Sequence, residues 1–181
     1  NTSTSKKYET GYLDINCSYL GTTSFVFSSD VYSYSNMLER INMVSYGASS
    51  ASYLFGYLRL LKSLSLSNNA TANVTDMGYM FYTCTSLQSV PQFDTANVTS
   101  GMNSMFYNCS SLKTVPLFNT SKVTDMGNMF YNCYSLKTVP LFNTVNVTSM
   151  QQMFSYCQSL ETVPLFNTAN VTSMYLMFSG C

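Results

Sequence analysis

The chain has 181 residues, of which 46% are hydrophobic and only 9% are charged, and its net charge is zero; ordinary globular chains carry roughly 25% charged residues. Nucleic acid is not expected as a partner, because no basic patch could neutralise phosphates. No apolar run reaches the length of about 18 residues that a membrane-spanning helix needs, so no membrane insertion is expected in this segment.

The first fifty residues show no clear repeat. Residues 24–29 (SFVFSS) are predicted to form a strand, and residues 36–44 (NMLERINMV) a short helix. The apolar side chains of that helix are expected to face inward: Leu38, Ile41 and Val44. An array of repeats needs a cap over its first apolar layer, so residues 1–49 are assigned to an N-terminal cap or linking segment.

Residues 50–181 form an array of repeats, about six turns with the last one truncated. Phenylalanines recur at spacings of 25, 24, 24 and 24 residues, each followed three residues later by a cysteine. The phenylalanines are Phe81, Phe106, Phe130, Phe154 and Phe178, and the cysteines are Cys84, Cys109, Cys133, Cys157 and Cys181. An earlier, degenerate turn contains LKSLSLSNN (residues 61–69), which is the L-x-x-L-x-L-x-x-N pattern of a leucine-rich repeat. The array is expected to end without a C-terminal cap, which suggests that the chain continues.

One repeat predicts a helix, a short extended segment and a turn. Met126, Met129, Phe130 and Cys133 fall at i, i+3, i+4 and i+7, which is one face of an α-helix and predicts a helix over 125–133. A strand of about three residues around 136–139 is expected to lose regularity at the recurring proline. The turn follows at Asn143. Leu66 is aligned with Leu141 of the later repeat.

Stacked units of this kind bury a continuous core that a single unit cannot bury. The predicted fold class is an α/β repeat solenoid: a leucine-rich-repeat-like, right-handed β–α superhelix with short parallel strands and short helices. The second aromatic of each repeat is also expected in the core: Phe93, Phe118, Phe142 and Phe166. Gln92 occupies the position before Phe93, which predicts that this position is only partly buried.

The cysteines are interpreted as a structural ladder rather than as disulfides. Five of the six occupy one position of the repeat, whereas disulfide frameworks show paired, varied spacings. Buried free thiols are common in protein cores. Zinc is not expected, because the chain has no histidine and no C-x-x-C.

No catalytic or cofactor-binding residues are proposed. Histidine, the commonest general base, is absent, and no phosphate-binding or dinucleotide-binding fingerprint occurs. Asp76 and Asp125 share one repeat position, where we expect them to begin helices. The sequons at Asn73, Asn97, Asn146 and Asn170 are interpreted as turn residues rather than as glycosylation sites.

The unit NVTDMGxMFYxCxSLxxVPLFNT resembles the BspA-like leucine-rich repeats of bacterial surface proteins. The similarity covers residues 61–181 well and 50–60 weakly. Proline replaces the aspartate that this family often carries, and two residues are missing before the FNT turn. The resemblance implies an exported, modular, non-enzymatic protein that binds other macromolecules, and similar repeats also occur in phage virion proteins.

Two stripes of side chains are candidate partner-binding surfaces. The first follows the repeat leucine, on the predicted exposed face of the sheet: Lys62, Gln88, Lys113, Thr114, Lys137, Thr138 and Glu161. The second is aromatic: Tyr82, Tyr107 and Tyr131, with Tyr134, Tyr156 and Tyr175 nearby. Tyrosine provides a large contact area at low entropic cost. The alternative interpretation of both stripes, which the sequence favours, is an ordinary solvated surface of the solenoid.

Three functions remain open at this stage. The first is a surface-displayed recognition or adhesion module, extracellular or on the cell surface, whose partner is a host matrix protein, a cell-surface protein or a glycan. The second is a phage virion protein, a tail or head appendage with a receptor-binding or decorating role. The third is a structural spacer.

Overall fold

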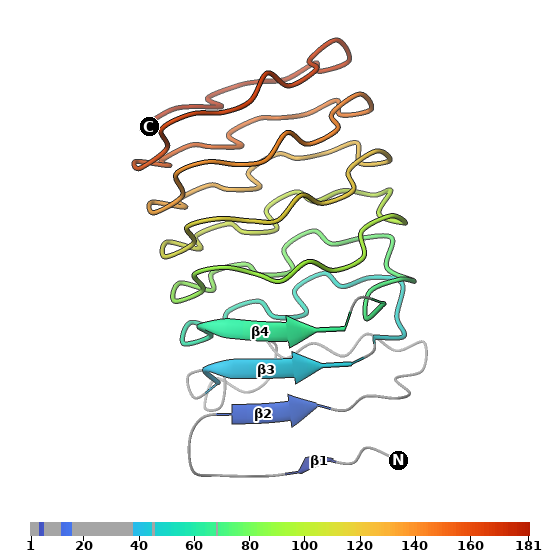
Figure 1. Cartoon of the computed structure of the whole chain (residues 1–181). Coiled ribbons are helices and arrows are strands. Elements are labelled where there is room, and N and C mark those ends of the chain that lie inside the picture. The colour runs from blue at the N-terminus through green and yellow to red at the C-terminus, as the bar shows by residue number, and fades with distance from the viewer. Residues whose placement is uncertain (1–3, 6–11, 16–37, 45, 68) are drawn as a thin grey trace.

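The computed structural model describes residues 4–5, 12–15, 38–44, 46–67 and 69–181. Successive turns of the chain stack on one another from the N-terminal to the C-terminal end (Figure 1). The predicted repeat solenoid is therefore confirmed. The strand predicted at residues 24–29 lies outside the described residues.

One side of the first turns carries a four-stranded sheet in the order β1 (Thr4–Ser5), β2 (Tyr12–Ile15), β3 (Arg40–Met43) and β4 (Ser63–Leu66). β1 pairs antiparallel with β2, whereas β2, β3 and β4 run parallel. In β4, serine and leucine alternate and only the leucines are buried. This period of two is what a half-buried strand requires.

The helix predicted over residues 36–44 is wrong in its described part. Arg40–Met43 is β3, in which Ile41 pairs with Leu64 and Met43 with Leu66. Ile41 and Met43 face the core, whereas Val44 is 45% exposed. The pattern that resembled a helix therefore has the period of a strand, and β3 continues the sheet into the segment before residue 50.

In the described chain, no strand follows β4. In the later turns only one or two backbone hydrogen bonds to the preceding turn flank each repeat leucine, as from Lys113 N–H to the Gln88 carbonyl (3.0 Å). The proline that follows in each turn has no N–H for the ladder, so regular pairing does not extend. Leu66 and Leu141 also differ: the side chain of Leu66 is buried, and that of Leu141 is 61% exposed.

The helix predicted over 125–133 is also wrong, and no helix occurs among the described residues. Asn128 and Asn132 have positive φ angles of 57° and 58°, which ends any right-handed helix at each of them. The N–H groups of Asn128 and Phe130 bind carbonyls of the next turn at 2.8 and 2.9 Å, while Met129 N–H closes a tight turn onto Met126. The short helices of the predicted α/β superhelix are thus replaced by consecutive turns.

These tight turns still bury the side chains that the helical pattern selected. Met126, Met129, Phe130 and Cys133 are each 0% exposed. The same backbone recurs in every turn with left-handed residues two positions before and two positions after the repeat phenylalanine. We refer to these two positions as the left-handed positions of a turn.

The core contains a stack of the repeat phenylalanines. Ring centroids lie 5.3 Å apart for Phe81 and Phe106 and 5.6 Å apart for Phe106 and Phe130, with interplanar angles of 2°. The stack continues through Phe154 to Phe178, whose side chain is 47% exposed. Phe93, Phe118 and Phe142 are 2% exposed, and Phe166 is partly buried against the core.

The cysteines of the repeat are free thiols in the described structure. Each buried Sγ–H donates to the carbonyl of a phenylalanine in the preceding turn, as from Cys133 to Phe106 (3.1 Å). Burial raises the pKa of the Cys133 thiol well above its usual value. Burial likewise raises the pKa of Cys157 to about 12. Cys181, in the last turn, is exposed, and Cys17 lies outside the described residues.

Asparagine and aspartate side chains close the remaining turns. Asn143 Oδ1 accepts from Val145 N–H (3.2 Å), which confirms the turn predicted there. The sequon residue Asn146 donates its amide to the Ser121 carbonyl of the preceding turn (2.7 Å). Asp125 does not begin a helix; its Oδ1 accepts from Gly127 N–H (2.8 Å), and Asp76 binds Gly78 in the same way (3.0 Å).

Candidate recognition surfaces

The polar row beside the repeat leucine lies on the surface, and its members pair along the solenoid. Its members are all exposed: Lys62, Gln88, Lys113, Thr114, Lys137, Thr138 and Glu161. Lys137 forms an ion pair with Glu161 (3.1 Å), and Lys113 donates to Gln88 Oε1 (3.4 Å). Lys62 pairs with Glu39 at 3.1 Å. These contacts join neighbouring turns and therefore need no external partner.

Tyr82, Tyr107 and Tyr131 form a stack on the opposite side of the backbone from the phenylalanines. Ring centroids are 4.8 Å apart for the first pair and 4.7 Å for the second, with interplanar angles of 14° and 3°. These separations match the distance between neighbouring strands. The stack therefore follows from placing tyrosine one residue after phenylalanine in three consecutive turns.

The structure adds three tyrosines that the sequence reasoning did not include. Tyr53 and Tyr79 stack at 4.7 Å, and Tyr57 lies nearly parallel to Tyr53, at 6.2 Å and 3°. Tyr79 meets Tyr82 at 5.8 Å, so this group joins the three-ring stack. An alignment on Phe55 and Phe81 was the available signal, because it places Tyr53 and Tyr79 at the same left-handed position.

Tyr156 closes the other end of the stack. Its ring meets that of Tyr131 at 5.5 Å and 71°. Gly180 leaves room for it: a Cβ at this glycine would lie 2.5 Å from Tyr156 Cδ1. Tyr134 and Tyr175 are exposed and make no ring contact within the described chain. We call the connected set the tyrosine face: Tyr53, Tyr57, Tyr79, Tyr82, Tyr107, Tyr131 and Tyr156.

The hydroxyls of the tyrosine face are available to a ligand. In the part of the chain that the structure describes, none of the seven forms a hydrogen bond with protein. Partial burial raises the pKa of Tyr107 above its usual value, and the neighbouring Tyr82, Tyr131 and Tyr134 raise it further. The Tyr107 hydroxyl is thus a neutral hydrogen-bond donor at physiological pH.

A different surface lies beside the prolines, where leucines recur. Leu117, Leu141 and Leu165 are 58%, 61% and 96% exposed. Gln92 takes this position in the preceding turn and is also exposed. The position before Phe93 was predicted to be partly buried, and its side chain is instead exposed.

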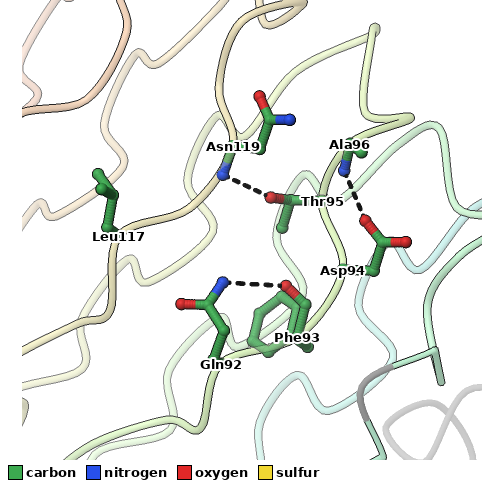
Figure 2. Close-up of a pocket in the computed structure, with 7 residues that line it drawn as sticks. All are labelled: Gln92, Phe93, Asp94, Thr95, Ala96, Leu117 and Asn119. Carbon is green, nitrogen blue, oxygen red and sulfur yellow. Dashed lines mark hydrogen bonds between the residues drawn. The ribbon is translucent and has the colours of Figure 1, made fainter.

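A pocket of about 320 Å³ opens where the leucine row begins, between Gln92 and Leu117. Figure 2 shows that its polar groups bind one another: Gln92 Nε2 donates to the Phe93 carbonyl (3.3 Å) and Asn119 N–H to Thr95 Oγ1 (2.8 Å). The carboxylate of Asp94 accepts from Ala96 N–H (2.9 Å). These pairings hold the backbone in shape and leave no acid–base pair facing the pocket.

Titratable side chains are dispersed. Within the described ranges, no three His, Cys, Asp or Glu residues gather into a group that could hold a metal ion. No helix there has the length and apolarity to cross a bilayer.

These observations define the class of the protein: a short-period solenoid built from consecutive turns, with an ordered aromatic face. The family model described as "Mycoplasma protein of unknown function, DUF285" matches residues 49–159 and 101–181, and the chain belongs to this family. No curated protein matches the chain.

A solved structure provides a similar fold. It is the crystal structure of a leucine-rich repeat protein from Eubacterium ventriosum, 22% identical, with a TM-score of 0.50. The similarity covers 74% of this chain and 44% of that protein, so the chain spans less than half of that protein's length. The leucine-rich-repeat architecture predicted from residues 61–69 is thereby supported at the level of the fold.

Proposed function

We propose that this chain is a non-enzymatic recognition module that binds a macromolecular partner, a protein or a glycan, through its tyrosine face. The observation that carries the proposal is the set of seven contiguous tyrosines whose hydroxyls bind no protein group within the described chain. Tyrosine offers apolar area and a polar tip with little side-chain entropy to lose.

The backbone beneath these rings supports the proposal. Tyr53, Tyr57, Tyr79 and Tyr156 have φ angles of 56°, 63°, 60° and 61°. A bulky side chain is unfavourable in the left-handed region, and the other non-glycine left-handed positions hold asparagine, threonine, serine, glutamine or leucine. The recurrence of tyrosine at four such positions supports a role for the rings at the surface.

The exposed row of Lys113 and Lys137 is the weaker candidate, because its charges pair within the row. An enzymatic role is not proposed, because the described Asp76, Asp94 and Asp125 hold backbone turns and the chain has no histidine.

We place this module outside the cell, on a bacterial surface, as the resemblance to BspA-like repeats suggests. The leucine-rich-repeat fold supports the binding role, since solenoids commonly bind partners on extended surfaces. A phage virion appendage would use the same face for a bacterial receptor.

Binding to intact cultured epithelial cells and to plates coated with extracellular matrix tests the proposal. The fluorescently labelled chain is compared with a Tyr107→Ser/Tyr131→Ser variant. A Lys113→Ser/Lys137→Ser variant is the matched control, because it removes two side chains in the same two turns. We expect saturable binding that falls about tenfold or more in the tyrosine variant and persists in the lysine variant.

Two results would contradict the proposal. If the lysine variant alone loses binding, the row beside the repeat leucine is the binding surface. If both variants keep the circular dichroism and the binding of the original chain, or if that chain binds nothing, the repeats are a spacer.

A further inference from the structure

The second left-handed position of each turn holds a large ring at both ends of the tyrosine stack and small polar side chains between them. Tyr57 and Tyr156 occupy the ends, with φ angles of 63° and 61°. The intervening turns carry Thr83, Asn108 and Asn132, also at positive φ. Because turns are about 4.8 Å apart, four steps separate the two rings by about 19 Å.

The two end rings are oriented differently from the stack. Tyr57 is inclined by 62° to Tyr82, and Tyr156 by 71° to Tyr131. Within the stack, neighbouring rings cover each other's faces, which leaves ring edges for solvent. Tyr57 and Tyr156 are 44% and 41% exposed, so they present ring surface that the stack does not cover.

The row of side chains at the second left-handed position carries no charge between Tyr57 and Tyr156. Asn108 and Asn132 are neutral and partly exposed, whereas Thr83 is neutral and buried. Among the described residues, Arg59 is the cationic side chain nearest in sequence to a ring of this face. An acidic ligand would need cations along its length, whereas hydroxyl and amide groups suit an uncharged ligand rich in hydroxyls.

The arrangement is linear and periodic, which indicates a linear ligand of repeating units. The faces of sugar rings carry C–H groups that pack on aromatic rings, and their hydroxyls exchange hydrogen bonds with phenols and amides. A protein partner with an apolar anchor would find a better surface at the leucines beside the prolines, of which Leu141 is 61% exposed.

We infer that the tyrosine face binds a linear, uncharged polysaccharide, with Tyr57 and Tyr156 as aromatic platforms at the two ends and Asn108 and Asn132 as hydrogen-bonding groups between them. This inference rests on the proposed function and specifies its ligand class.

The test uses dextran, mannan and xyloglucan as neutral probes, and hyaluronan and heparin as acidic ones. Binding to the whole chain is measured by isothermal titration and by retardation in polysaccharide-containing gels. The test variant is Tyr57→Asn/Tyr156→Asn, because asparagine is well tolerated in the left-handed region and keeps the fold. Tyr175→Asn is the matched control, since this tyrosine is exposed and makes no ring contact with the tyrosine face in the described chain.

We expect at least one neutral polysaccharide to bind and the double variant to bind about tenfold or more weakly. The control should bind within about twofold of the original chain. Absence of binding to every neutral probe, tighter binding to the acidic probes, or equal losses in control and double variant would overturn the inference.

Cell treatments separate this inference from the proposed function. Periodate destroys sugar rings that carry neighbouring hydroxyls, and protease removes surface proteins. Tyrosine-dependent cell binding that survives periodate and is lost with protease would overturn the polysaccharide as ligand while the recognition function stands. Cell binding that is lost after periodate treatment and survives protease would support both the recognition function and the polysaccharide ligand.

Discussion

The phenylalanine stack and the tyrosine stack lie one residue apart in the same turns and have nearly the same geometry. Phe106 and Phe130 stack at 5.6 Å and 2°, and Tyr107 and Tyr131 at 4.7 Å and 3°. They differ in continuity: phenylalanine occupies every turn, whereas the position after it holds tyrosine in three consecutive turns and Gly56, Ser155 or Ser179 in the others. The spacing of rings is thus imposed by the fold, but only the buried stack is required by it.

The largest expected effect is the loss of a ring from the buried stack. Phe130→Ala should lower the free energy of unfolding by about 3–5 kcal/mol, because a fully buried aromatic is replaced by a cavity. Denaturant unfolding measures it. Phe178→Ala is the control, since this ring is 47% exposed; equal losses for both variants would show that the stack is not the stabilising element.

Alkaline pH should weaken the core beneath the phenylalanines. Burial raises the pKa of Cys157 from 9.0 to about 12, so the folded chain keeps a proton that the unfolded chain releases. The contribution of this thiol to the free energy of unfolding should therefore be constant below pH 9 and should fall as the pH rises above 9. Denaturant midpoints at successive pH values test this, and Cys157→Ala should make the decline shallower. A decline equally steep in that variant would exclude the thiol as its cause.

A ring taken from the tyrosine stack should matter much less for stability. Tyr107→Ser should lower the free energy of unfolding by about 1–3 kcal/mol, because Tyr107 stacks on both Tyr82 and Tyr131 and each aromatic pair contributes about 0.5–1.5 kcal/mol. Ser155 already occupies this position in another turn. A loss as large as that of Phe130→Ala in the same denaturant assay would mean that the tyrosines are part of the core.

Substitution of Tyr156, at one end of the tyrosine face, should change the free energy of unfolding little, because relief of backbone strain offsets the loss of a ring contact. Tyr156→Asn relieves a left-handed tyrosine, worth about 1–2 kcal/mol, and loses the edge contact with Tyr131, worth about 0.5–1.5 kcal/mol. The net change should stay within about 1 kcal/mol, measured by thermal and denaturant unfolding. A larger destabilisation would assign Tyr156 a structural role.

The smallest effect is expected in the exposed polar row. Removing the ion pair with Lys137→Ser should change the free energy of unfolding by at most about 1 kcal/mol, because exposed ion pairs are weak. Salt titration is the check: the difference should shrink as ionic strength rises, and persistence at high salt would indicate a packing contribution instead.

Much of the architecture was predictable from the sequence alone. The spacing of Phe81, Phe106 and Phe130 indicates stacked units, and the apolar pattern from Met126 to Cys133 selects side chains that the structure buries. Asn143 was predictable as a turn. These features depend on local periodicity and on the hydrophobicity of individual side chains, and both can be read directly from the amino-acid sequence.

Only the tertiary structure decided how the backbone satisfies its hydrogen bonds and which tyrosines meet. Apolar residues at i, i+3, i+4 and i+7 suit a helix, but consecutive tight turns bury the same set. The choice between them rests on bonds to the next turn, such as that from Phe130 N–H to the Met153 carbonyl. Likewise, Tyr53 and Tyr79 are distant in sequence and stack only because one turn lies on the next. Contacts between turns depend on how the units stack, which no single repeat specifies.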